Sequence, residues 1–270
     1  MAALVNERAC IIRNEPVGPR LHLLELESPE IAGAVQPGQF VHIKLPGFEQ
    51  HVLRRPFSIY AADPTTGIIE ILYQEVGSMT AVMPSIQNGV FETIGPIGNG
   101  WTGASRFSEG RSSRALLVGG GVGAAPLFML AQELHTLGCL TDVVLGAQTF
   151  EALVARKRYQ NLFGTEPCCA TDDGSYGRAG FCTSLVEERL RDGCLSDGSG
   201  YDYLAVCGPE PLMKIVAHMG SENSVYTEVS MEKRMACGIG ACLSCVVDTV
   251  DGKRRSCVDG PVFDASIIVW

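Results

Sequence analysis

The chain has 270 residues, of which 46% are hydrophobic and 19% are charged, and it carries a formal net charge of −9 at pH 7. This composition excludes a disordered chain, the length allows two or three domains, and the acidic balance argues against nucleic-acid binding. Glu7 and Arg8 lie where a secretion signal would have its apolar core. The nearly uncharged stretch 115–131 contains several glycines. We therefore expect a cytoplasmic protein without a membrane span.

Residues 1–100 are predicted to be rich in β-strands. They contain short apolar or alternating runs, namely RLHLLELE, QFVHIKL, RPFSIYAAD and GIIEILYQEV. Turn formers such as PGQ, LPGFE and DPTTG separate these runs. Strands at this spacing favour an antiparallel barrel or sandwich, and we assign the first domain to residues 1–104.

The polar segment 104–114, ASRFSEGRSSR, is a predicted linker, and the pattern changes after it. Strand-like runs such as ALLVGG, TDVVLGAQ and YDYLAVCG alternate with the helical runs VGAAPLFMLAQELHTLG, FCTSLVEERLRDG and PEPLMKIVAHMG. This alternation predicts a parallel sheet with crossover helices in residues 112–220. Residues 221–270 are short-segmented, glycine-bearing and rich in cysteine, and form a predicted third domain. The expected fold class is a multi-domain α+β protein.

A glycine-rich turn follows the first strand of the predicted parallel sheet. In LLVGGGVGAAPLFML, residues 116–130, Gly119-x-Gly121-x-x-Ala124 fits the dinucleotide-binding form G-x-G-x-x-G/A. Glycines here let the backbone approach a pyrophosphate, so Gly119, Gly120, Gly121 and Gly123 are candidate cofactor-binding residues. The alternative is a turn that only packs a strand against a helix.

A second strand end has similar features. In AVCGPEPLM, Cys207 and Gly208 close a strand, and two prolines bracket a helix start. Both residues are candidates for cofactor binding, because the carboxyl end of a parallel strand faces the ligand crevice. The alternative for Cys207 is a small core residue.

The residues after the next strand bear on the choice of nicotinamide cofactor. Gln148 and Thr149 include no arginine to meet a 2′-phosphate, although three cations lie further on at 156–158. This favours NADH over NADPH. Asp142 precedes the strand, so it is not assigned to the ribose.

Four of the eleven cysteines form a C-x4-C-x2-C pattern with a later fourth member: Cys237, Cys242, Cys245 and Cys257. A cytosolic thiol pool keeps cysteines reduced, so disulfides are not expected. This spacing is the plant-type [2Fe–2S] pattern, and the small residues between the cysteines allow backbone amides to turn toward sulfur. Zinc, which usually takes two x2 pairs, and unligated cysteines are the alternatives.

Three motifs in this order, RRPFS (54–58), GGGVGAAP (119–126) and CGPEP (207–211), resemble the ferredoxin–NADP reductase superfamily. Two further segments, EKRMACGIGACLSC (232–245) and TDDGSYGRAGFCTSLV (171–186), are similar to the electron-transfer subunits of class 1B dihydroorotate dehydrogenases. The resemblance implies an N-terminal antiparallel β-barrel that binds FAD, a central Rossmann-like domain that binds NAD, and a small C-terminal [2Fe–2S] domain.

The resemblance also assigns residues to the flavin. In the family, an arginine of the RxFS motif meets the pyrophosphate, and the aromatic and serine positions lie near the flavin ring. The residues implied here are Arg55, Pro56, Phe57, Ser58, Leu72, Tyr73, Gln74, Met79 and Thr80. Two positions depart from the family, which commonly has arginine near position 74 and glycine at position 79.

The implied activity is electron transfer between NAD and an FMN-containing dihydroorotate dehydrogenase catalytic subunit, in pyrimidine (UMP) biosynthesis. Electrons would pass through the FAD and the [2Fe–2S] cluster, and the implied assembly is a heterotetramer with two copies of each subunit. The chain offers no evident base for dihydroorotate, which points to the partner for that step. Its histidines, His22, His42, His51, His135 and His218, show no metal-type spacing and are expected to be structural.

Two other functions fit parts of the sequence. The same cofactor layout resembles reductase subunits of bifurcating transhydrogenases or sulfide dehydrogenases. In a different class, the cysteines would hold zinc in a non-enzymatic interaction module, and the glycine turn would serve packing alone. A metal analysis together with a visible spectrum distinguishes the zinc hypothesis from the two flavoprotein hypotheses.

Overall fold

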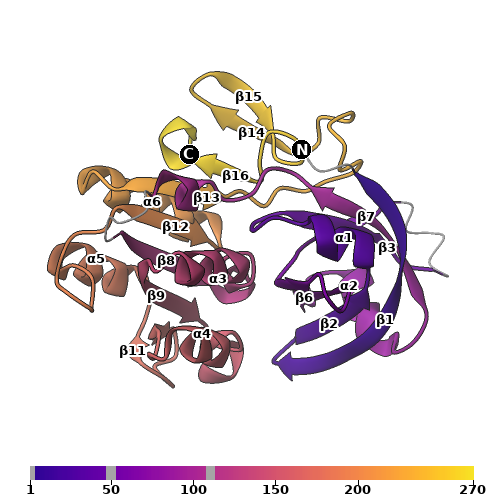
Figure 1. Ribbon diagram of the computed structural model, residues 1–270, viewed down its shortest axis with the longest axis horizontal. Helices are drawn as coiled ribbons and strands as arrows, with labels where there is room; N and C mark the ends of the chain where they lie inside the picture. The colour runs from indigo at the N-terminus through magenta and orange to yellow at the C-terminus, as the bar shows by residue number, and fades with distance from the viewer. Residues whose placement is uncertain (1–3, 47–52, 108–112) are drawn as a thin grey trace.

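The computed structural model describes residues 4–46, 53–107 and 113–270. Their strands form two seven-stranded sheets and one two-stranded hairpin. The two sheets lie side by side, and the C-terminal segment runs across the top of both (Figure 1). His51 and part of the predicted linker lie outside the described residues.

The first sheet is antiparallel and curls around its own apolar core (Figure 1). Its order is β4-β3-β7-β1-β2-β6-β5. The strands are β1 (Val5–Gly18), β2 (Leu21–Glu27), β3 (Phe40–Lys44), β4 (Arg55–Ser58), β5 (Ala61–Asp63), β6 (Ile68–Gln74) and β7 (Val90–Ile97). Three short helical segments accompany them: α1 (Pro29–Ala34), α2 (Ser78–Val82) and η1 (Met83–Ser85). The predicted antiparallel β-region is confirmed.

The second sheet is parallel except for its last strand, in the order β11-β10-β9-β8-β12-β13-β16. The strands are β8 (Arg114–Gly120), β9 (Leu140–Ala147), β10 (Cys168–Thr171), β11 (Arg178–Ala179), β12 (Tyr203–Cys207), β13 (Tyr226–Ser230) and β16 (Val262–Asp264). The chain moves outward from β8 through β9 and β10, then returns to β12 on the other side of β8. The carboxyl ends of β8 and β12 therefore form the switch point at which doubly wound sheets bind ligands.

Helices cover both faces of this sheet. The helical segments are η2 (Gly103–Arg106), η3 (Gly121–Ala124), α3 (Phe128–Thr136), η4 (Phe150–Ala152), α4 (Arg156–Phe163), α5 (Thr183–Asp192), α6 (Glu210–Glu222) and η5 (Ala265–Ile267). On one face, α3 and α4 share a core with Tyr60 and Leu72 of the first sheet's region, so apolar packing joins the two sheets. On the other face, α5 and α6 pack with β13 and the C-terminal residues. None of the helices in the described part of the chain is long and apolar enough to cross a bilayer.

The predicted helix 122–138 begins later than its apolar spacing indicates. Residues 121–124 form the short turn η3, and α3 starts only at Phe128. Pro126 explains the delay, because proline has no backbone N–H and disfavours helical geometry in the residue before it. The helical expectation is thus correct for the second half of the segment and wrong for the first.

Two polar contacts fix the angle between the sheets. Arg158 of α4 donates two hydrogen bonds of 2.6 Å to the Glu70 carboxylate of β6, and its guanidinium lies 4.6 Å from the ring centre of Tyr60. The Trp101 indole N–H donates to the Pro126 carbonyl at 2.9 Å. A bidentate arginine pair is directional, so it restricts rotation as well as separation.

A buried carboxylate ties the connection between the sheets to β13. Glu228 is 2% exposed and accepts hydrogen bonds from the amide and hydroxyl of Thr102, the amide of Gly103 and the hydroxyl of Tyr203. Tyr203 is buried, and the two amides belong to the backbone that connects the sheets. Such a carboxylate is stable only while all its partners are present.

The C-terminal segment contains the hairpin of β14 (Val246–Thr249) and β15 (Gly252–Arg255) and returns as β16 to pair with β13. β13 and β16 both lie within 221–270, so part of that range completes the second sheet. The multi-domain α+β fold class is confirmed: an antiparallel sheet, a doubly wound sheet and a cysteine-bearing C-terminal segment follow one another along the chain.

Replacement of Glu228 by alanine should lower the free energy of unfolding by about 3 kcal/mol, because buried donors lose a charged acceptor. Urea denaturation followed by tryptophan fluorescence measures this loss. Glu187→Ala, which removes an exposed carboxylate from α5, is the matched control and should change the value by less than about 0.5 kcal/mol. Equal effects of the two substitutions would contradict the role given to Glu228.

Replacement of Gly123 by alanine should destabilise the switch point by about 1–3 kcal/mol. A methyl group there would lie 2.6 Å from the Cys207 carbonyl oxygen and 2.7 Å from Gly208 Cα, and neither backbone atom can move cheaply. Gly33→Ala in α1 is the control: it meets no atom within 4 Å and should stabilise the protein by up to about 1 kcal/mol. Thermal or urea unfolding of both variants shows whether each substitution lowers or raises the free energy of unfolding.

Candidate functional site

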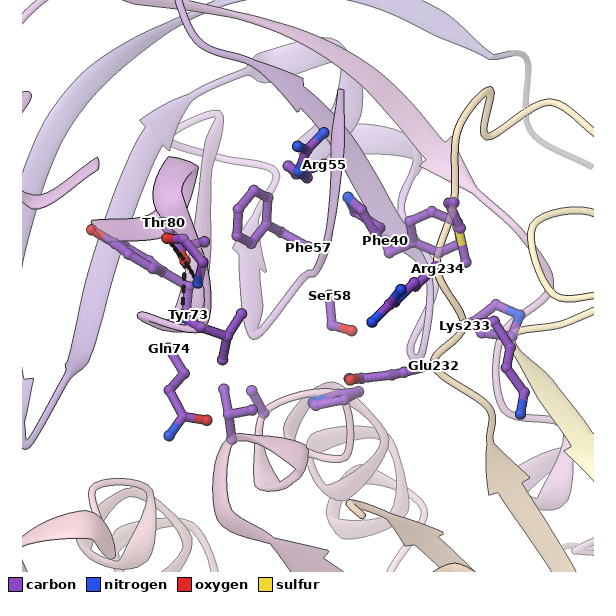
Figure 2. A pocket seen from close by; sticks show the side chains of 18 of the residues that line it. Phe40, Arg55, Phe57, Ser58, Tyr73, Gln74, Thr80, Glu232, Lys233 and Arg234 are labelled. Carbon is purple, nitrogen blue, oxygen red and sulfur yellow. Dashed lines mark hydrogen bonds between the residues drawn. The ribbon is translucent and has the colours of Figure 1, made fainter. Parts of the chain in front are cut away.

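One cavity of about 860 Å³ brings together all nine residues that the resemblance assigns to the flavin. They are Arg55, Pro56, Phe57, Ser58, Leu72, Tyr73, Gln74, Met79 and Thr80. The cavity lies between the first sheet, the turn after β8 and the segment that follows β13, as Figure 2 shows. It is large enough for a dinucleotide-sized ligand.

The side chains of the RxFS strand contribute both to the core of the first sheet and to the cavity wall. Phe57 turns into the core of the first sheet and is 9% exposed. The Arg55 guanidinium donates to the Leu53 carbonyl at 2.8 Å and lines the cavity, as does Ser58. Lys233 and Arg234 of the C-terminal segment also line the cavity (Figure 2), and the Lys233 ammonium is paired with Glu210 at 3.1 Å.

In the second flavin stretch, 72–74, the middle side chain packs into the core of the first sheet. Tyr73 is 2% exposed, its ring stacks on His22, and its hydroxyl donates to Asn14 at 2.9 Å. Burial raises the pKa of Tyr73. Its phenol thus belongs to the core, while Gln74 is exposed where the family commonly has arginine.

The third flavin stretch is the start of α2. The Thr80 hydroxyl accepts hydrogen bonds from the amides of Val76 (2.9 Å) and Gly77 (3.0 Å). Met79 is 4% exposed and packs into the core of the first sheet. The methionine that replaces the family's glycine therefore packs its side chain into this core, and the residue still lines the cavity.

The glycine turn and the CGPEP turn pack against each other at the switch point. Gly119 and Cys207 are paired neighbours on β8 and β12, and Gly123 lies against Cys207 and Gly208. From the glycine turn, only Val122, with the following Ala125 and Pro126, lines the cavity. None of the predicted glycines lines this cavity: Gly119, Gly120 and Gly123 are buried, and Gly121 is exposed.

Cys207 has no exposed surface and lies in the core that joins the sheets. Burial raises the pKa of its thiol well above the usual range. Cys207 does not line the cavity, which favours the alternative that it is a small core residue. Gly208, at φ 154°, lies close to Gly120 and allows the two turns to approach.

Sequence reasoning missed Glu232. This residue lines the cavity beside Ser58 (Figure 2), and its side chain is exposed there. Desolvation raises the pKa of its carboxyl group. Its place two residues after the last parallel strand of the sheet was the available signal, since strand ends at this edge face the ligand crevice.

Two of the three cations downstream of β9 are already paired. Arg156 forms an ion pair with Glu166, and Arg158 is held by Glu70. Lys157 is exposed on α4. This arrangement favours a cofactor without a 2′-phosphate, in agreement with the prediction of NADH.

The four predicted cluster cysteines occur as two contacting pairs. After Ser244, Cys237 lowers the pKa of Cys242, and after burial, Cys245 raises the pKa of Cys257, so the members of each pair lie close together. Across the described ranges, no three His, Cys, Asp or Glu side chains are gathered to hold a single metal ion. Two pairs of sulfurs fit a two-iron cluster, in which each iron takes two thiolates, better than one tetrahedral zinc.

The loop that carries these cysteines has the backbone needed to surround sulfur. Gly238 and Gly240 adopt φ values of 70° and 80°, and the Ile239 amide donates to the Cys237 sulfur at 3.5 Å. Hydrogen bonds from Ser244, followed by those from Cys237, lower the pKa of Cys242 to about 6. Cys242 is exposed, whereas Cys245 and Cys257 are each 2% exposed.

Comparison with known proteins agrees with these features. Residues 232–269 match the family model described as the iron–sulfur cluster binding domain of dihydroorotate dehydrogenase B. The most similar relatives include the dihydroorotate dehydrogenase B (NAD(+)) electron transfer subunits of Geobacillus sp. (strain WCH70), at 35% identity over 97% of this chain and 98% of the relative, and of Desulforamulus reducens, at 34% identity over 94% of each.

Solved structures give the same fold. An NADH-dependent reduced ferredoxin–NADP oxidoreductase, studied for flavin-based electron bifurcation, superposes with a TM-score of 0.83 at 27% identity, over 97% of this chain and 90% of that one. The ferredoxin reductase of a carbazole 1,9a-dioxygenase, at 20% identity and a TM-score of 0.63, shares the fold over 82% of this chain and 67% of that one. Given its near-complete overlap with the curated relatives, the chain belongs to the family of dihydroorotate dehydrogenase B (NAD(+)) electron transfer subunits.

Proposed function

We propose that this chain carries electrons between NAD and an FMN-containing dihydroorotate dehydrogenase catalytic subunit, through FAD and a [2Fe–2S] cluster, in pyrimidine biosynthesis. One observation carries the proposal. Phe40 and Met235 line the cavity and also pack against Cys245 and Cys257. A single layer of side chains thus separates the proposed flavin cavity from two of the proposed cluster ligands.

The cavity fits FAD by its size and its charge. Arg55, Lys233 and Arg234 supply cations for a diphosphate, and a guanidinium can hold two phosphate oxygens at once. Apolar side chains such as Phe57 and Leu72 suit a flat ring system. We assign the nine residues of the RxFS strand, β6 and α2 to flavin binding on this basis.

NAD is assigned to the carboxyl edge of β8 and β12. We assign the glycines from 119 to 123, with Cys207 and Gly208, to the dinucleotide, and Val122 of the same turn lines the proposed flavin cavity. Cys207 acts here through its backbone, because its side chain is in the core. We keep NADH as the proposed nicotinamide cofactor.

A bound flavin supplies the exchange between paired electrons, as in NADH, and the single electrons that a [2Fe–2S] cluster accepts. The protein's part is to hold the reacting groups in order and to exclude water. Ser58 places a hydroxyl at the cavity wall, and Glu232 can hold a proton in the same cavity because its pKa is raised. Arg158 and Glu70 keep the two sheets at a fixed angle, which fixes the approach of the nicotinamide side.

The exposed edge of the cysteine loop is the proposed docking point for the catalytic subunit. Ile239 and Leu243, 56% and 63% exposed, flank the exposed Cys242. Apolar side chains around an exposed ligand give a partner a surface that shields the cluster from water. We propose that dihydroorotate oxidation requires this partner, in a heterotetramer of two copies of each subunit.

We propose three functional domains, 1–104 for FAD, 112–220 for NAD and 221–270 for the cluster, with β13 and β16 of the last range completing the NAD-side sheet. A cytoplasmic location is proposed from the eleven cysteines, none of which is in a disulfide.

The neighbouring bifurcating oxidoreductase supports a second candidate, a flavin and iron–sulfur reductase subunit with a different partner. Affinity purification of the tagged chain from its own cells distinguishes them. An FMN-containing dihydroorotate-oxidising partner is expected, and a glutamate-synthase-like partner would favour the alternative. If the purified protein were colourless and contained zinc, both candidate functions would be wrong.

Replacement of Arg55 by alanine should weaken FAD binding by about 10- to 100-fold, since charged hydrogen bonds contribute about 1.5–3 kcal/mol. Titration of the flavin-depleted protein with FAD, followed by flavin fluorescence, measures the dissociation constant. Arg54→Ala is the control, because the Arg54 guanidinium is paired with Glu92 and is not in the cavity wall. The flavin assignment fails if both variants bind FAD as tightly as the parent protein.

Replacement of Cys242 by serine should abolish the electron paramagnetic resonance signal of the reduced cluster and leave NADH-to-dye electron transfer largely intact. The dye takes electrons from the flavin, which precedes the cluster in the proposed order. Cys10→Ser changes an exposed cysteine on β1 and should keep both properties. Loss of flavin reduction by NADH in Cys242→Ser would contradict the linear order.

A further inference from the structure

His42 is a buried histidine for which the fold leaves no obvious use. It lies on β3, where Val41 and Ile43 point into the core of the first sheet. His42 and Phe40 occupy the alternate positions and so lie on the opposite face of the strand. The C-terminal segment covers that face, and His42 has no exposed surface.

Both ring nitrogens of His42 lack a hydrogen-bond partner. Among the described residues, only three side chains contain a buried nitrogen or oxygen without a partner, and His42 alone has two such atoms. An unpaired buried donor costs about 1–3 kcal/mol, and nearly all such donors in folded proteins are satisfied. A histidine kept only for packing would lose nothing on replacement by an apolar ring.

The imidazole lies directly against the cysteine loop. A methyl group added to Gly238, the residue after Cys237, would lie 2.7 Å from His42 Nδ1 and 2.8 Å from Cε1. Gly238 also adopts φ 70°, so its conformation and its space both favour glycine. Phe40, whose ring centre is 6.0 Å from that of His42, packs with Cys245 and Cys257. The ring is therefore beside the proposed ligands.

The His42 ring can donate a hydrogen bond to sulfur, because an imidazole carries at least one N–H in either protonation state. A neutral imidazole carries one N–H, and the cysteine thiolates and sulfides of an iron–sulfur cluster are negatively charged acceptors. Hydrogen bonds to these sulfurs raise the reduction potential, because the reduced cluster carries one more negative charge.

We propose that His42 is a positioning and tuning residue that donates its N–H to a sulfur of the [2Fe–2S] cluster. The inference rests on the proposed function, which supplies the cluster. The donor comes from the flavin-side sheet, whereas the cysteines come from the C-terminal segment. The hydrogen bond thus joins the two parts and stabilises the cluster in its reduced form, with one electron gained and no proton transferred.

The test uses the full chain, reconstituted anaerobically with iron and sulfide, and His42→Phe, His42→Gln and His22→Phe. His42→Phe keeps a ring without a donor, and His42→Gln restores an N–H. His22→Phe is the control, because His22 is also buried in the first sheet but stacks on Tyr73. Redox titration followed by electron paramagnetic resonance measures the midpoint potential of each cluster.

We expect a lower midpoint potential in His42→Phe, partial recovery in His42→Gln and no shift in His22→Phe. Pulsed resonance of the parent protein should also show an exchangeable proton and, after ¹⁵N-histidine labelling, a nitrogen coupled to the cluster. This second measurement stands even if His42→Phe fails to load iron.

A parent protein with a normal [2Fe–2S] signal but no histidine coupling would overturn the inference and leave the proposed function intact. An unchanged midpoint potential in a loaded His42→Phe protein would do the same. A parent protein that binds no [2Fe–2S] cluster under any anaerobic loading would instead overturn the proposed function.

Discussion

The packing of the cysteine segment onto the outer face of β3 is the constraint on which the function depends. Phe40 and Met235 form one layer of side chains that touches the cavity on one side and two buried cysteines on the other. Electron transfer needs centres that are close but chemically separate. A thicker layer would slow transfer, and a thinner one would admit water and ligand to the sulfurs.

A second constraint is the fixed angle between the two sheets. The shared apolar core brings them together without specifying a direction, because hydrophobic contact is non-directional. The Arg158–Glu70 pair and the Glu228 carboxylate add that direction. The turn after β8 is consequently held at the cavity, whose wall includes Val122, Ala125 and Pro126.

Charge is distributed unevenly over a molecule whose net charge is −9. The cavity gathers Arg55, Lys233 and Arg234, and Glu232 adds one carboxyl group whose pKa desolvation raises. Cations suit the diphosphates of the cofactors, whereas a carboxyl with a raised pKa suits proton exchange during reduction. The overall acidity therefore says little about the site, and the local charges define what it can bind.

The sequence by itself determined the motifs and the order of the domains. Cysteine spacing, the RxFS strand and the glycine turn are local patterns, in which a few neighbouring residues carry the chemistry. Only the tertiary structure decided that the nine residues assigned to the flavin by resemblance share one cavity with Glu232. It also decided that Cys207 is in the core and that His42 lies against the cysteine loop. These facts depend on contacts between distant segments, and no pattern along the chain records which distant side chains will meet.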